Sequence, residues 1–243
     1  MNKKAVVLSS GGLDSTTCLA VVVDKYGAEN VTSISVKYGQ KHLQELYYAS
    51  RIADVYGVDH YVLDLSSIFK ASDSSLLGHS NKDVPEGSYV DQQRESETGI
   101  VSTYVPFRNG AMLSAVTAYS MSLYPDYNID IYLANHADDA AGNAYPDCSE
   151  TFSIFMSDAI FEGTGHQVRL HTPFAGLHKA DIVKKGLELN VPYQLTWSCY
   201  KGENKACGVC GTCIDRIEAF KKNGVIDPIE YSNLIEDPFK ELR

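Results

Sequence analysis

Two adjacent glycines, Gly11 and Gly12, separate a short β-branched run at residues 4–9 from a helical stretch that ends at Gly27. A strand that passes through glycines directly into a helix is typical of the first unit of a parallel β/α fold. The first N–H groups of such a helix are unpaired and carry partial positive charge, and glycine lets an anion approach them closely. The loop therefore predicts an anion site at the start of a helix that Asp14 or Ser15 can cap.

The alternation of strand and helix continues along the chain. We predict further strands at residues 31–38, 60–65, 129–134 and 168–172, and further helices at residues 41–56, 108–124, 150–161, 179–189 and 214–222. Parallel strands joined by right-handed crossovers place helices on both faces of the sheet. The fold class is therefore α/β, with a Rossmann-like parallel sheet and a ligand at the carboxyl ends of its strands. Residues 66–103 lack periodicity and are predicted to form a long loop or lid.

Charge and hydropathy exclude several classes of protein. The chain has 243 residues and a formal charge of −10, which repels polyanions, so we expect no stable binding to nucleic acid. The longest apolar run, at residues 18–23, is far shorter than the ~20 residues of a membrane span. The apolar run at residues 5–8 is too short for a signal peptide. We therefore expect a cytoplasmic protein with no membrane partner.

Four of the six cysteines gather near the end of the sequence. Three are spaced two residues apart and the fourth lies upstream, a pattern that suits tetrahedral zinc, with Gly208 and Gly211 relieving the tight turns between Cys199, Cys207, Cys210 and Cys213. An iron–sulfur cluster and disulfides are the alternatives, although the Cys-x3-Cys-Pro continuation of ferredoxins is missing. We predict a zinc-binding segment at residues 193–243, packed on an α/β domain at residues 1–192. Cys18, inside the first helix, is expected to fill the core.

The string from Ser10 to Ser15, Ser-Gly-Gly-Leu-Asp-Ser, resembles the PP-loop of the ATP pyrophosphatases. The sequence contains neither the Gly-Lys of a Walker loop nor a Gly-x-Gly-x-x-Gly fingerprint. The resemblance implies that ATP is cleaved between its α and β phosphates and that AMP is transferred to an acceptor oxygen. It also implies Mg²⁺ near Asp14, and nucleotide contacts from Leu8, Ser9, Ser10, Gly11, Gly12, Leu13, Asp14, Ser15, Thr16, Thr17 and Cys18. A tight turn without a ligand is the alternative.

Further motifs, in the same order along most of the chain, resemble the QueC family. They are Tyr38-Gly39-Gln40-Lys41-His42, Val105-Pro106-Phe107-Arg108-Asn109, Tyr145-Pro146-Asp147-Cys148, His171-Thr172-Pro173, Lys179-Ala180-Asp181 and Thr196-Trp197-Ser198-Cys199-Tyr200. The resemblance implies an adenine nucleotide alpha hydrolase-like fold and a homodimer. It also implies a ligase that forms carbon–nitrogen bonds and uses ATP, Mg²⁺ and ammonia. Its small-molecule substrate, 7-carboxy-7-deazaguanine, would become 7-cyano-7-deazaguanine through adenylated acid and amide intermediates, on the route to queuosine.

The same resemblance suggests roles for residues beyond the loop. Arg108 and Lys179, with Asp14, are the candidate catalytic residues, because cations can stabilise negative charge on phosphoryl or acyl oxygens. A helix N-terminus disfavours a cation, so Lys179 is expected to pair with an anion, a solvated lysine being the alternative. Substrate contacts are assigned to Asn109, Tyr145, Asp147 and Cys148, with Asp147 on the guanine-like edge and Cys148 in the pocket wall. A turn that caps the next helix is the alternative for residues 145–148.

One segment departs from the family pattern. His136-Ala137-Asp138-Asp139 and a long spacer at residues 140–144 stand where relatives usually have a Glu-Thr-Asp-like triplet and a shorter spacer. If this loop touches the base, the reaction could stop at the amide. The two aspartates could serve Mg²⁺ or substrate amines, or form a solvated turn. A tRNA-modifying PP-loop enzyme, and a zinc-ribbon interaction module on a degenerate nucleotide fold, are the other functional alternatives.

Overall fold

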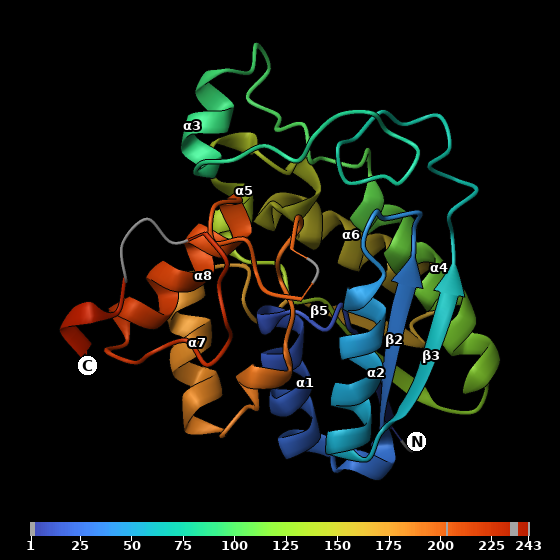
Figure 1. The fold of residues 1–243 in the computed structure, drawn as a ribbon. Helices are drawn as coiled ribbons and strands as arrows, with labels where there is room; N and C mark the ends of the chain where they lie inside the picture. Colours follow the sequence, from blue (N-terminus) through green and yellow to red (C-terminus); the bar gives the residue numbers. More distant parts are fainter. Residues whose placement is uncertain (1–2, 203, 234–237, 243) are drawn as a thin grey trace.

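Five parallel strands form one sheet in the order β3-β2-β1-β4-β5 (Figure 1). The computed structural model describes residues 3–202, 204–233 and 238–242. The chain moves outward from β1 on one side through β2 and β3, and on the other through β4 and β5, so the switch point lies between β1 and β4. The predicted Rossmann-like sheet is confirmed. The strands are β1 (Lys3–Leu8), β2 (Val31–Lys37), β3 (Asp59–Asp64), β4 (Asn128–Tyr132) and β5 (Val168–His171).

Helices cover both faces of the sheet, because successive side chains of a strand point to opposite faces (Figure 1). In β1, Ala5 and Val7 pack with α1, α2, α7 and α8, whereas Val6 and Leu8 pack with α4 and α6. The longer helices are α1 (Leu13–Tyr26), α2 (Gln44–Tyr56), α4 (Arg108–Leu123), α6 (Glu150–Gly163), α7 (Lys179–Glu188) and α8 (Gly211–Lys222). Short helical turns are α3 (Tyr89–Arg94), α5 (Ala137–Ala140) and the 3₁₀ segments Ala28–Asn30, Ala141–Asn143, Pro146–Cys148, Tyr193–Leu195 and Lys240–Leu242.

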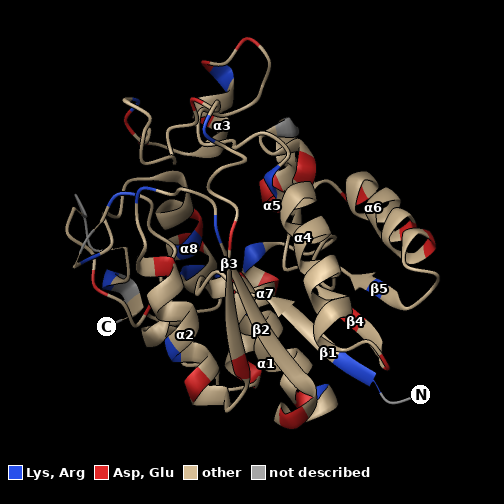
Figure 2. Ribbon diagram, turned by 90° about the vertical axis from the view of Figure 1, so that its right-hand side faces the viewer, with Lys and Arg blue, Asp and Glu red and all other residues tan. Residues whose placement is uncertain are grey.

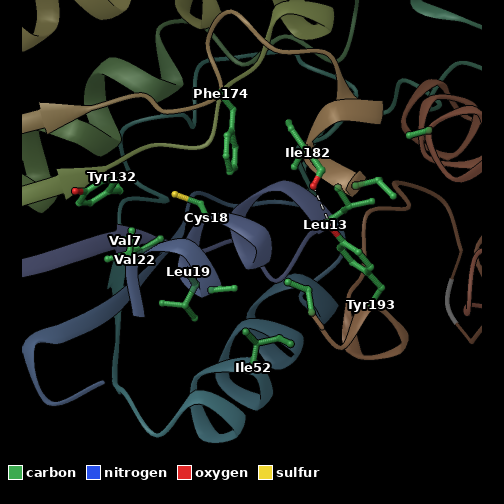
Figure 3. Packing of buried hydrophobic residues seen from close by; sticks show 14 of the residues in the cluster. Val7, Leu13, Cys18, Leu19, Val22, Ile52, Tyr132, Phe174, Ile182 and Tyr193 are labelled. Atoms are coloured by element: carbon green, nitrogen blue, oxygen red, sulfur yellow. Dashed lines mark hydrogen bonds between the residues drawn. The ribbon is translucent and has the colours of Figure 1, made fainter. Parts of the chain in front are cut away.

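The core on the α1 face fixes α1 beneath the loop that precedes it. Leu13, Cys18 and Leu19 of α1 point into this core together with Ile52 of α2 and Ile182 of α7 (Figure 3). Cys18 is fully buried, as expected for a residue that fills the core. The loop between β1 and α1 is therefore held on a rigid base.

Part of the C-terminal segment shares this core, and its cysteines belong to another cluster together with Tyr38, Leu77 and Val105 from the rest of the chain. Phe220 of α8 and Phe239 belong to the same hydrophobic cluster as α1 and α7. Arg216 is 1% exposed and donates from Nε and Nη2 to both carboxylate oxygens of Asp227, at 2.7 and 2.9 Å. Its Nη1 donates to Thr196 Oγ1 at 2.7 Å. This buried network joins α8 to the segment around Thr196, which follows the predicted boundary at residue 192.

Residues 66–103, predicted as a loop, contain the helix α3. Its six residues are too few to show helical periodicity, but Ser88 caps it by accepting a hydrogen bond from Asp91 N at 3.2 Å. The preceding residues contact the C-terminal segment, since Gly87 N donates to Val209 O at 3.0 Å and Lys201 pairs with Glu86 at 2.6 Å. Figure 1 shows α3 beyond the carboxyl ends of the strands. The loop therefore covers the edge of the sheet where a ligand is expected.

Charged residues of both signs are mixed on the surface, and the described helices are short or polar. Lys and Arg positions are interspersed with Asp and Glu over the outer helices (Figure 2). Within residues 3–202, 204–233 and 238–242, no helix combines the length and apolar character needed to cross a membrane.

Candidate functional site

An open cavity of about 200 Å³ lies at the carboxyl ends of the central strands, around the switch point between β1 and β4. Of the residues that the sequence suggested, those in its wall are Leu8, Ser9, Ser10, Gly12, Asp14, Ser15, Arg108, Asn109, Cys148 and Lys179. Those outside its wall are Gly11, Leu13, Thr16, Thr17, Cys18, Tyr145 and Asp147. Segments that are distant in the sequence thus meet around one space.

The loop after β1 leaves the start of α1 open to the cavity. Gly12 is the N-cap residue and makes no side-chain cap, so neither Asp14 nor Ser15 caps the helix. The Ser10 and Ser15 hydroxyls lie 3.1 Å apart, and Ser10 Oγ accepts a hydrogen bond from Gly12 N at 3.3 Å. Such hydroxyls can turn to donate to an incoming anion. Backbone N–H groups and hydroxyls therefore converge on the space beside the loop, as an anion site requires.

Gly11 and Gly12 have different surroundings. Gly11 has a φ of +73°, and a Cβ there would lie 2.5 Å from the backbone atoms Ala49 N and Glu45 O of α2. Gly12 lines the cavity instead. The first glycine therefore lets α2 approach the loop, and the second leaves room for the ligand.

We expect Gly11→Ala to destabilise the protein by about 1–3 kcal/mol more than Gly57→Ala, because overpacking against the α2 backbone adds to the left-handed strain. Gly57 is a matched control, since its φ is +64° and nothing lies within 4 Å of an added Cβ. Urea unfolding of the wild type and both variants measures the two losses of stability. Equal losses in both variants would contradict the close approach of α2.

Lys179 and Asp14 form an ion pair at the floor of the cavity. The Lys179 side chain is 7% exposed, and its Nζ donates to Asp14 Oδ2 at 3.2 Å. Lys179 is the first residue of α7, so Asp14 is the anion expected to offset the helix dipole. Burial opposes ionisation of Asp14, but Lys179 and His136 hold the pKa of its carboxyl well below the usual range. Burial likewise opposes a charged Lys179, and Asp14 and Asp139 outweigh it, raising the ammonium pKa. Both groups are therefore charged at neutral pH.

His136 lies behind this pair and was not singled out as a site residue from the sequence. It is fully buried, and its Nε2 lies 3.6 Å from Asp14 Oδ2 and 3.4 Å from Asp139 Oδ2. Burial disfavours its charged form, but Asp139 and Asp14 raise its pKa overall. The imidazole thus contacts both carboxylates that line this side of the cavity.

The two neighbouring aspartates have separate positions. Asp138 Oδ2 accepts a hydrogen bond from Lys179 N at 2.8 Å, and Asp138 Oδ1 lies 2.7 Å from His178 Nδ1. Asp138 therefore fixes the start of α7. Asp139 lines the cavity.

Asp147 supports the start of α4 and does not face the cavity. Its Oδ2 accepts from Asn109 N at 2.8 Å. Asn109 Nδ2 donates to Asp147 O at 3.0 Å and to Cys148 Sγ at 3.2 Å. Tyr145 packs edge-on against Tyr89, with ring centroids 5.5 Å apart. Arg108 reaches the cavity and lies over the Tyr38 ring at 5.2 Å. The turn at residues 145–148 thus holds Arg108, Asn109 and Cys148 in the wall.

Asn135 is a cavity residue that the sequence analysis missed. It is 4% exposed, and its Nδ2 donates to Cys148 O at 2.8 Å and to Ser153 Oγ at 3.0 Å. Because Cys148 O can only accept, the orientation of the amide is fixed, and its Oδ1 has no hydrogen-bond partner among the described residues. Its place just after β4, at the carboxyl edge of the sheet, was the one signal in the sequence.

The four C-terminal cysteines form a buried group that can hold a metal ion. The sulfur atoms of Cys199, Cys207, Cys210 and Cys213 all lie within 4.8 Å of one another, and none forms a disulfide. A single tetrahedral ion with metal–sulfur distances of about 2.3 Å requires sulfur separations of about 3.8 Å. Backbone N–H groups support the thiolates: Gly202 N and Cys207 N donate to Cys199 Sγ at 3.0 and 3.1 Å, and Cys210 N donates to Cys207 Sγ at 3.3 Å.

The cysteine segment also builds one wall of the cavity. Trp197 N donates to Gly11 O at 2.8 Å, and Ser198 Oγ accepts from Leu13 N at 3.4 Å. A Cβ at Gly211 would lie 2.9 Å from the ring of Tyr89, which is itself in the wall. The position of this wall therefore depends on the fold of the cysteine segment.

Comparisons with known proteins match nearly the whole chain. The profile of the family described as "Queuosine biosynthesis protein QueC" matches residues 4–224. A protein named 7-cyano-7-deazaguanine synthase from Caldicellulosiruptor saccharolyticus is 45% identical over 228 residues, which are 94% of this chain and 95% of its own. A protein of the same name from Pseudoalteromonas atlantica is 42% identical over 95% of this chain and 100% of its own length. Another, from Thermoplasma volcanium, is 42% identical over 100% of this chain and 96% of its own length. The matched residues include the loop after β1 and all four clustered cysteines.

Proposed function

This chain belongs to the QueC family of queuosine biosynthesis proteins, and from that premise we propose that it makes 7-cyano-7-deazaguanine from 7-carboxy-7-deazaguanine, ammonia and ATP. The observation that carries the proposal is the single cavity that the glycine loop, the Lys179–Asp14 pair and Arg108 share. An anion site and two cations around one space suit a reaction between a carboxylate and the α-phosphate of ATP. Relatives that span nearly the full chain carry the name of this synthase.

The chemistry explains why ATP is needed. A carboxylate is a poor electrophile, because oxide is a poor leaving group. Its oxygen attacks the α-phosphorus, the bond to the bridging oxygen breaks, and pyrophosphate leaves toward the loop. Ammonia then attacks the carbonyl carbon of the adenylate and loses a proton, and AMP leaves to give the amide.

The nitrile requires a second adenylation. The amide oxygen attacks the α-phosphorus of another ATP, and pyrophosphate and one proton leave. The carbon–oxygen bond then breaks, AMP departs and the nitrogen loses its last proton. One cavity can serve both rounds, since the acid and the amide present an oxygen at the same place.

The residues of the cavity have distinct roles in this proposal. Ser10 and Ser15, with the N–H groups at the start of α1, bind the departing phosphates. Lys179 and Arg108 stabilise the charge that develops on the phosphoryl and acyl oxygens. Asp139 and Asn135 offer acceptors to the ammonia or the amide nitrogen.

Two metal ions fit the residues of the chain. Asp14 lines the cavity, and its Oδ1 is a buried acceptor with no hydrogen-bond partner in the described ranges, so it suits Mg²⁺. When bound, that ion would neutralise the charge of the pyrophosphate. Cys199, Cys207, Cys210 and Cys213 suit Zn²⁺, which would stabilise the fold of their segment.

The proposal is tested by incubating the purified protein with ATP, Mg²⁺, ammonium and 7-carboxy-7-deazaguanine, followed by mass spectrometry of nucleotides and deazapurines. We expect the nitrile, with AMP and pyrophosphate formed in equal amounts. Accumulation of the amide alone would restrict the activity to the first round and direct attention to residues 136–144. An unchanged acid in the presence of metal-loaded protein would overturn the proposal.

A further inference from the structure

We propose that the carboxylate of Glu45 binds the edge of the deazaguanine that carries two adjacent donors, the ring N1–H and the 2-amino group. This inference rests on the function proposed above, because it names how the substrate of that reaction is recognised. It makes Glu45 a residue that determines specificity in the first turn of α2, a place that the sequence motifs did not single out.

Glu45 lies in the cavity wall beside the glycine loop. A Cβ added at Gly11 would lie 2.5 Å from the Glu45 carbonyl oxygen, so the first turn of α2 packs directly against the loop. Glu45 lines the cavity together with Tyr38, Tyr200 and Arg108, and its carboxylate interacts electrostatically with Arg108 and Tyr38. The substrate must also lie beside the loop, because its carboxylate has to reach the α-phosphate.

Among the described residues, the Glu45 carboxylate interacts with Arg108 only through its charge. No hydrogen bond or ion pair of this group occurs within the described ranges, whereas Asp14 pairs with Lys179 and Asp139 lies beside His136. Arg108 donates to Tyr38 OH at 3.4 Å rather than to Glu45. Burying a carboxylate that accepts no hydrogen bond is costly for the folded state. Such a group calls for an explanation, and a ligand that supplies the missing donors is one.

Electrostatics agree with this placement. Burial raises the pKa of Glu45 to about 7, and Arg108 opposes that rise. The other titratable groups around it are Tyr38 from the end of β2, Tyr200 from the C-terminal segment, and Lys41 and His42 from the turn before α2. A ligand that donates two hydrogen bonds would favour the ionised carboxylate.

The chemistry of the ligand edge distinguishes the two bases that enter the cavity. A carboxylate has two acceptor oxygens and no donor, so it matches the N1–H and 2-amino donors of a guanine-like ring. The corresponding edge of adenine has one donor and one acceptor, which an ionised carboxylate does not match. Asp147, the acid that the sequence suggested for this edge, has its Oδ2 bound to Asn109 N and lies outside the cavity wall.

The test compares two ligands and two variants. The ligands are 7-carboxy-7-deazaguanine and the analogue without its 2-amino group, 7-carboxy-7-deazahypoxanthine. Trp197 is the single tryptophan of the chain and lines the cavity, so its fluorescence reports binding without turnover. The variants are Glu45→Gln and, as a matched control, Asp54→Asn at an exposed position of the same helix.

We expect Glu45→Gln to weaken binding of 7-carboxy-7-deazaguanine about 10- to 100-fold, because a donor replaces one charged acceptor. The wild type should prefer this ligand to the analogue, and Glu45→Gln should bind both alike. ATP binding should be unchanged in both variants, and Asp54→Asn should behave as the wild type. The raised pKa of Glu45 means that ionising this carboxyl lowers the stability of the folded wild type as the pH rises from 4.5 through about 7. Glutamine does not ionise, so the Glu45→Gln variant should stay folded at pH 8.

Three outcomes would contradict the inference. If Glu45→Gln prefers 7-carboxy-7-deazaguanine as strongly as the wild type does, Glu45 does not bind this edge, and the proposed function stands. If it loses ATP binding to the same extent, Glu45 supports the loop and not the substrate. If the wild type binds ATP but neither deazapurine, the proposed function fails and the inference fails with it.

Discussion

Replacing Asp14 by alanine is expected to lower the rate of AMP formation by at least about 10²- to 10³-fold, while the cysteine group keeps its metal. Asp14 holds the Lys179 ammonium in the cavity floor at 3.2 Å, and its second oxygen, Oδ1, has no hydrogen-bond partner among the described residues and is the proposed Mg²⁺ ligand. Without it, Lys179 is a buried cation that lacks its hydrogen-bonded partner, a change that typically costs about 3–5 kcal/mol of folding free energy. Rapid-quench measurement of AMP and metal analysis of the same sample check both parts.

A double variant separates the chemical effect of Asp14 from its effect on stability. Asp14→Asn combined with Lys179→Met removes both charges of the pair, so most of the lost stability should return. AMP formation should remain absent, because neither the proposed Mg²⁺ ligand nor the positive charge beside the phosphoryl oxygens is restored. Activity in the double variant would show that the pair is structural. Loss of the metal from Asp14→Ala would show that the loop and the cysteine segment do not fold independently.

Replacing Cys210 by serine is expected to unfold the segment that contains the cysteines and to abolish ligand binding in the cavity. Structural zinc sites contribute roughly 10–16 kcal/mol of apparent binding free energy, which is as large as the ~5–15 kcal/mol net stability of a typical domain. Trp197, Ser198 and Tyr200 line the cavity just before and after Cys199, so the wall should be lost with the metal. The β1–β5 sheet should persist, because its core is formed mainly by the strands, α1, α2, α4, α6 and α7.

The loss of the wall is measured by limited proteolysis, by the fluorescence of Trp197 and by an ATP-binding assay. Elemental analysis identifies the metal. Cys18→Ala is the matched control, since Cys18 is also a buried thiol but lies in the core of α1. It should cost only about 1–2 kcal/mol and keep the metal and the ligand. Iron and inorganic sulfide in the wild type would overturn the assignment of zinc. Full ATP binding by metal-free Cys210→Ser would show that the wall does not need the metal.

The sequence predicted the sheet because its strands and long helices are contiguous and periodic. It did not predict α3 and α5, which have six and four residues and depend on contacts with distant segments. Within the site, the helix dipole indicated that Lys179 needs an anion. Nothing local identified Asp14, 165 positions away, as that anion.

The cavity wall beyond the glycine loop was only partly predictable from motifs. Asp147 belongs to a recognisable motif, yet its carboxylate binds the backbone of α4, because the turn at residues 145–148 folds under that helix. Glu45, Asn135 and His136 face or support the cavity through the packing of strands and helices, and no spacing in the sequence encodes their proximity. Motif positions therefore identified part of the cavity wall, and the packing of distant segments determines the rest.

The contact between the two ends of the cavity also constrains how the protein is made. Leu13 N and Ser198 Oγ meet across 185 positions of sequence, so the loop leaves the ribosome long before its wall exists. At about 5–20 residues per second, that interval lasts roughly 10–40 s. A nascent chain in this period has the glycine loop but not the part of the cavity wall that residues 197–200 supply. The order of synthesis thus postpones completion of the cavity until nearly the last part of the fold has been assembled.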